Sequence, residues 1–111
     1  MRYMIKMDMA NDAGNMAIRD PKFGEKMQAL LKEIKAEAAY FTTVNGQRGG
    51  YIIINMDDAS QIPAMVEPLF LWFKANVELI PVMLPQDLAK AGPAIGAAVQ
   101  KWDSYRTLDM G

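Results

Sequence analysis

Hydrophobic and polar positions in the first 44 residues predict two strands joined by a helix. Residues 2–9 are expected to form the first strand, and residues 38–44 the second. The polar, glycine-containing segment at residues 10–20 is expected to be a loop. That loop is longer than the usual connection of about 4–6 residues, and long loops often carry function.

The predicted helix follows this loop, because apolar residues recur there on one helical face. Asp20 suits the N-cap position, and Pro21 suits the first turn, where its missing N–H costs nothing. The residues that share the face are Phe23, Met27, Leu30, Leu31 and Ile34. The helix is expected to end near Glu37.

Asn45 and Gly46 predict a hairpin between the second and third strands. The residues GQRGG that include Gly46 suggest a loop longer than two residues. The third strand is expected at residues 51–56. Its apolar run from Tyr51 to Ile54 does not alternate with polar residues, as a strand with one exposed face would.

Beyond the hairpin, spaced apolar residues predict a helix at residues 62–73, which Pro68 should kink or split. Asp57, Asp58 or Ser60 would cap its start. Residues 77–84 are predicted to form the fourth strand. Because Pro81 cannot donate a hydrogen bond to a neighbouring strand, this strand should lie at a sheet edge.

The C-terminal part is expected to add a helix and a tail, at residues 85–111, to a single domain that spans residues 1–111. The helix should open at Pro85 and break at Gly92-Pro93. The polar residues 103–111 show no clear element.

The order strand–helix–strand, repeated once and followed by an extra helix, is that of a ferredoxin-like βαββαβ plait. We therefore expect an α+β fold with a four-stranded antiparallel sheet in the order 4-1-3-2. The third strand is then central, which suits its continuous apolar run. The second and fourth strands lie at the edges.

Both faces of this sheet are apolar, but the main helices of a plait cover only one. On the other face, Ile53, Ile80 and Val82 would form an apolar patch of some hundreds of Å², which monomers usually avoid. Either the C-terminal helix folds back over this face, or a second copy packs against it. We favour the homodimer, because the broken, alanine-rich C-terminal helix is a thin cover.

Composition narrows the functional classes. The 111 residues carry a formal net charge of −1 without a basic stripe, so nucleic acid and membranes are poor candidate partners. The sequence lacks the pattern of a signal peptide and is expected to be cytoplasmic. It contains no cysteine and no histidine, so thiolate chemistry is excluded and the commonest general base is missing. No cofactor or metal is expected.

The run RGGYIIINMDDASQIPAMVEPLFLWFKANVELIPVM, Arg48 to Met83, resembles small domains of unknown function in the dimeric α/β-barrel superfamily. The resemblance covers roughly residues 1–90 and implies two ferredoxin-like plaits packed sheet to sheet. The wider superfamily includes muconolactone isomerases, small monooxygenases, haem proteins and stress-response barrels. Its chemistry often depends on histidine, which this chain lacks, so the resemblance implies no catalytic residue.

Lys6 is the first candidate ligand-binding residue, because a charged side chain in a central strand needs a partner. It would bind an anionic or carbonyl ligand with Asn55, its expected neighbour. Alternatively, it pairs with Asp8, Asp57 or Glu78, or lies at the dimer interface.

Arg48 and Tyr40 are the other candidates. Arg48 would clamp a carboxylate, unless it is an ordinary exposed turn residue. Tyr40 would donate to a carbonyl oxygen, unless it only packs on its strand. Asp57 and Asp58 are better explained as helix caps than as metal ligands.

Two functions remain open. The first is a small-molecule-binding protein or cofactor-free enzyme that holds a small apolar or aromatic ligand; the ten methionines suit an adaptable pocket. The second is a non-catalytic dimerisation or regulatory module without a ligand. Whether the protein is an enzyme is left open by the sequence.

Overall fold

The computed structural model describes residues 1–110, and the side chains of residues 1–106. The strands are β1 (Arg2–Asp8), β2 (Ala38–Val44), β3 (Gln47–Asn55) and β4 (Asn76–Pro81). The helices are α1 (Asn11–Arg19), α2 (Phe23–Glu33), a 3-10 turn η1 (Ala59–Gln61), α3 (Ile62–Phe73), α4 (Pro85–Lys90) and α5 (Gly92–Met110). In the described chain, no helix combines the length and the apolar character that a membrane span requires.

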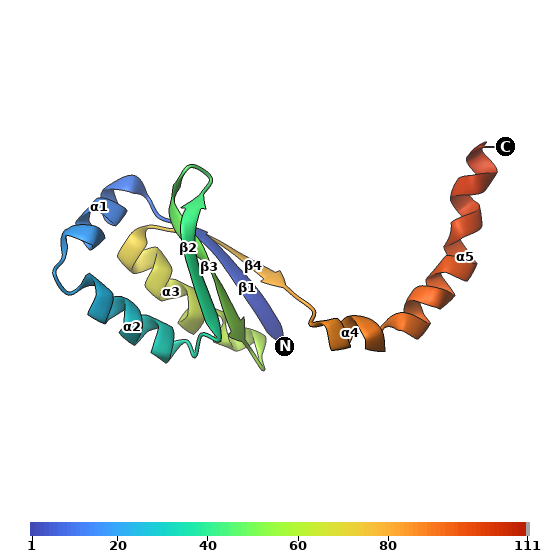
Figure 1. Cartoon of the computed structure of the whole chain (residues 1–111), viewed down its shortest axis with the longest axis horizontal. Helices are drawn as coiled ribbons and strands as arrows, with labels where there is room; N and C mark the ends of the chain where they lie inside the picture. Colours follow the sequence, from blue (N-terminus) through green and yellow to red (C-terminus); the bar gives the residue numbers. More distant parts are fainter. Residues whose placement is uncertain (111) are drawn as a thin grey trace.

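The strands form one antiparallel sheet in the order β2-β3-β1-β4, shown in Figure 1. This is the predicted ferredoxin-like plait, with β1 and β3 central and with β2 and β4 at the edges. Pro81 ends β4, so its lack of an N–H breaks no interior ladder.

Helices α1, α2 and α3 cover one face of the sheet, and the hydrophobic core lies between these helices and the sheet. Alternation along the strands turns Ile5, Ile52 and Ile54 to this covered face, where each is at most 2% exposed. Leu69 and Phe73 of α3 pack onto them from above. The spacing that predicted α3 therefore identified the helix face that is buried.

The expected loop at residues 10–20 is wrong, because most of this segment is helix α1. Ala13 and Ala17 lie one turn apart and are both buried. Their small side chains let the helix approach the sheet and α3 closely, whereas the asparagines and the glycine of this segment favoured the loop prediction. The packing that stabilises α1 is therefore tertiary.

Helix α2 is shorter than predicted and begins later. Asp20 accepts a hydrogen bond from the backbone nitrogen of Lys22 (2.9 Å), so it caps the turn before α2 rather than α2 itself. The helix ends at Glu33, and Lys35 adopts a left-handed conformation with φ 54°. That residue turns the chain into β2.

The β2–β3 hairpin is tighter than expected. Asn45 and Gly46 both have positive φ, 52° and 78°, and form a two-residue turn. The expected longer loop is wrong because Gly49 and Gly50 belong to β3, not to the turn. A Cβ atom at Gly49 would collide with the carbonyl oxygen of Met7, so close approach of strands requires glycine there.

Two further expectations concern α3 and the C-terminal part. Asp58 caps η1 by accepting from the backbone nitrogen of Ser60 (2.8 Å), which confirms the capping role. Helix α3 continues through Pro68 and is not split there. A break separates α4 from α5 at Ala91, directly before the predicted Gly92-Pro93, but the expected tail is wrong, since α5 continues to Met110.

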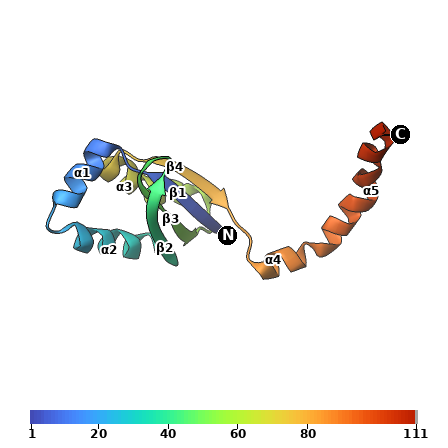
Figure 2. The same ribbon diagram turned by 45° about the horizontal axis from the view of Figure 1, so that its top comes forward.

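Helices α4 and α5 form an arm that leaves the sheet after Pro81 (Figures 1 and 2). In both views the arm lies on the opposite side of the sheet from α1–α3. The described part of α5 packs on no strand and on none of these helices. The alternative that the C-terminal helix folds back over the uncovered sheet face is therefore wrong for this structure.

Candidate functional site

A cavity of about 240 Å³ lies between the sheet and the N-terminal helices. Met9, which follows β1, and Phe23 and Met27 of α2 form its inner wall. Ile18 of α1 and Phe41 of β2 form its lips, and each is more than half exposed. The wall is thus built of methionines and aromatic rings, as the sequence suggested for a pocket, but at a place that the sequence did not indicate.

Arg48 brings a positive charge to this cavity. Alternation along β3 turns its side chain toward the helix layer, where its Nη1 donates to Asn15 Oδ1 of α1 (2.9 Å). The guanidinium lies against Gly14, and a Cβ atom there would meet Arg48 Nη1 at 3.1 Å. Among the described side chains, no carboxylate forms an ion pair with Arg48.

The cavity therefore combines an apolar interior with one cation that no carboxylate among residues 1–106 neutralises. Thr42, at the same wall, adds a hydroxyl group. The described lining residues contain no carboxylate, amine or phenol that would transfer a proton. The chemistry of these groups favours binding of an anion with an apolar body over acid–base catalysis.

Lys6 and Tyr40 lie on the opposite, open face of the sheet. The register aligns Tyr40 with Tyr51, Tyr51 with Lys6, and Lys6 with Glu78, so one row of side chains crosses all four strands. Lys6 Nζ lies 4.0 Å from Glu78 Oε1. Of the partners considered for Lys6, Glu78 is the one it contacts.

Beside this row lies an apolar row that also crosses the sheet. The aligned residues are Ala38, Ile53, Met4 and Ile80. All four side chains are partly exposed, and no described element covers them. The open face thus has an apolar centre next to the Lys6–Glu78 pair.

A third row is polar and holds the most buried charge of the described chain. Asp8 is 6% exposed and accepts hydrogen bonds from Asn45 Nδ2 (3.0 Å) and Asn76 Nδ2 (2.8 Å). These two bonds, and more weakly the charge of Lys6, lower the pKa of the Asp8 carboxyl group below its ordinary value. Asp8 therefore ties the hairpin turn to the start of β4.

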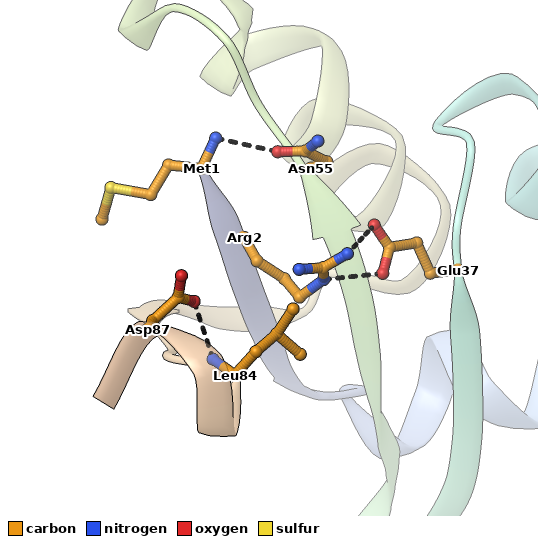
Figure 3. A network of polar contacts seen from close by, with 6 residues as sticks. All are labelled: Met1, Arg2, Glu37, Asn55, Leu84 and Asp87. Carbon is orange, nitrogen blue, oxygen red and sulfur yellow. Dashed lines mark hydrogen bonds and ion pairs between the residues drawn. The ribbon is translucent and has the colours of Figure 1, made fainter. Parts of the chain in front are cut away.

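Asn55 is not the neighbour of Lys6, so that expectation is wrong. It pairs with Arg2 at the far end of β3, and its Oδ1 accepts from the backbone nitrogen of Met1 (2.8 Å; Figure 3). Arg2 in turn donates through Nε to Glu37 Oε2 at 2.7 Å. Asn55 thus belongs to a polar network that fixes the start of β1.

The four predicted site residues therefore lie in three places: the cavity, the middle of the open face and the end of β3. Only Lys6 and Tyr40 share a row, with Tyr51 between them. The sequence missed the cavity walls because Met9, Ile18 and Phe41 come from separate segments of the chain. It also missed the Asp8 network, whose asparagines lie 37 and 68 residues along the chain.

A search of curated proteins finds no match to this chain. One family model, "Domain of unknown function (DUF3303)", matches residues 1–96. The match includes the whole sheet, helices α1–α3 and the walls of the Arg48 cavity. The chain therefore belongs to the DUF3303 family of domains of unknown function.

Proposed function

We propose that the protein binds a small organic anion with an apolar or aromatic body in the Arg48 cavity. One observation carries the proposal: an apolar cavity of about 240 Å³ has in its wall an arginine that no described carboxylate pairs with. This volume is slightly below the usual range of about 300–1,000 Å³, which restricts the ligand to small metabolites. The carboxylate would face Arg48, and the apolar body would contact Met9, Met27 and Phe41.

Flexible walls support this proposal. Met9 and Met27 are thioethers with several rotatable bonds, so they adjust to ligands of different shapes. The exposed rings and branches at the lips, Phe41 and Ile18, lose water contact when an apolar body binds between them. The ligand would displace water from these surfaces and keep its charged group at the rim.

Calorimetric titration with benzoate, phenylacetate and neutral benzamide tests the proposal. We expect the carboxylates to bind about tenfold or more tightly than benzamide, because a charge-assisted hydrogen bond is stronger than a neutral one. Arg48→Gln should abolish this preference. Lys6→Gln, which removes the same charge from the opposite face, should preserve it.

Absence of binding by both carboxylates at about 10 mM, a concentration that would detect weak affinity, would refute the proposal. So would an Arg48→Gln variant that still prefers carboxylates. Circular dichroism of each variant controls for loss of fold.

A second candidate function is assembly of a homodimer through the open sheet face, with or without a ligand. The supporting observation is the apolar row through Met4, Ile53 and Ile80, which no described element covers. In this arrangement two plaits pack sheet to sheet, as in the dimeric α/β-barrel superfamily that the sequence resembles. Lys6 and Glu78 would then lie at the interface.

Analytical ultracentrifugation tests the dimer. The parent should sediment as a dimer, and Ile53→Lys should raise its dissociation constant by about 100-fold or more, since an unpaired charge would be buried. Gln28→Lys, which adds the same charge to the exposed side of α2, is the matched control. A parent chain that is monomeric at all accessible concentrations would rule out this second function.

A further inference from the structure

The arm formed by α4 and α5 is exposed to an unusual degree. The chain has a Cα radius of gyration of 19.2 Å and extends over 63 Å, whereas a compact chain of this length has a radius of about 13 Å. The difference arises from the arm, which leaves the body after Pro81 (Figure 1). Every described residue of the arm from Gly92 onward is exposed.

Helix α5 nevertheless has an apolar face. Ile95, Val99 and Trp102 follow at i, i+4 and i+7, so they lie on one side of the helix. Each side chain is roughly half exposed, with values of 48%, 56% and 53%. Gln100 lies on the other side, Asp103 lies at the edge of the apolar face, and Arg106 continues this face at i+11. Three large apolar side chains therefore lie close together on α5 and are available for contact with another surface.

In proteins most helical stability comes from tertiary packing, and the described part of α5 packs on none of the helices α1–α3. The surface that the extended arm exposes is large enough for a protein–protein interface. The chain exposes 7957 Å², but a compact monomer of 12.4 kDa exposes about 6,100 Å². The excess of about 1,800 Å² exceeds the roughly 800 Å² that each partner buries in a standard complex.

We propose that the arm clasps a second copy of this chain, with Ile95, Val99 and Trp102 packed against the partner's body. Helices α1–α3 lie to one side of the sheet in Figures 1 and 2, and the arm lies to the other. A second copy that covers the open face sits on the same side of the sheet as the arm. The inference rests on the proposed homodimer and assigns the arm to its interface.

A reciprocal exchange of arms follows from the symmetry of a dimer, because each arm meets the same surface of the other copy. It also explains why α5 is detached from its own body. The arm would contribute affinity beyond that of the sheet faces, and its apolar face would be buried only in the dimer.

The test compares two triple variants of the full chain by analytical ultracentrifugation. One carries Ile95→Ala, Val99→Ala and Trp102→Ala, and the other carries Lys90→Ala, Gln100→Ala and Asp103→Ala at exposed polar positions of the arm. We expect the apolar triple variant to raise the dimer dissociation constant about 100-fold or more, and the polar one to change it less than about threefold. Alanine preserves helix propensity in both.

The outcomes separate the two interfaces. If Ile53→Lys weakens the dimer but the apolar arm variant does not, the sheet-face dimer stands and the arm inference is overturned. If the parent is monomeric, both are overturned. Urea unfolding of the two triple variants at monomer concentrations should match, because the arm is not part of the core of the body.

Discussion

The two faces of the sheet carry similar apolar side chains but meet different surroundings. On β3, Ile52 and Ile54 turn to the helices and are 2% and 0% exposed, whereas Ile53 between them faces outward and is partly exposed. The same strand therefore supplies both the core and the open face. The apolar run in this strand therefore contributes to both faces of the sheet, and helices α1–α3 cover one of these faces.

The largest expected effect comes from the covered face. Ile54→Ala should lower the free energy of unfolding by about 3–4 kcal/mol, because it removes buried methyl groups and leaves a cavity. Ile53→Ala, at monomer concentrations, should cost less than about 1 kcal/mol. Urea unfolding measures the free energy of unfolding of both variants. Equal decreases would mean that the two faces of the sheet do not differ in burial.

A smaller effect is expected from the polar row of the open face. Asp8→Asn should lower the free energy of unfolding by about 2 kcal/mol, since two side-chain hydrogen bonds to a charged group are weakened. Because folding lowers the pKa of Asp8, its contribution is complete above the ordinary pKa of an aspartate. It is lost as the pH falls through the lowered value.

Urea unfolding at a series of pH values checks this effect. The difference in the free energy of unfolding between the parent and Asp8→Asn should be constant between about pH 5 and pH 8. It should shrink below about pH 4. A difference that instead grows toward acid pH would show that Asp8 is not the stabilising carboxylate.

The smallest effect is expected for the Lys6–Glu78 pair. Its atoms are 4.0 Å apart and Glu78 is mostly exposed, so Lys6→Met should change the free energy of unfolding by no more than about 0.5 kcal/mol. Thermal unfolding at monomer concentrations measures it. A loss above about 1.5 kcal/mol would show that Lys6 is held in the open face more tightly than this contact indicates.

Much of the fold was predictable because it depends on local patterns. The alternation and apolar runs of β1–β4, the spacing in α3, the Asn45-Gly46 turn and the constraint at Pro81 led to the right sheet order. Helix α1 was missed since its asparagines and Gly14 are typical of a loop. The glycines of β3 were assigned to a loop because their role, close approach to Met7 and Tyr40, involves residues from other strands.

The candidate site was less predictable. Arg48 was recognised as a cation that suits a carboxylate, but its cavity depends on Met9, Ile18 and Phe41, which come from three separate segments of the chain. Asn55 was placed beside Lys6 because both lie in central strands. The antiparallel register instead pairs it with Arg2, and register is a property of the paired strands rather than of either one.

The amino-acid sequence by itself determined the strand order, the edge position of β4 and the apolar character of both sheet faces, because these follow from side-chain periodicity and proline geometry. Only the tertiary structure decided where the cavity lies, which charges are paired and that the C-terminal arm leaves the open face bare. Those features depend on contacts between residues far apart in the chain, which local periodicity does not encode.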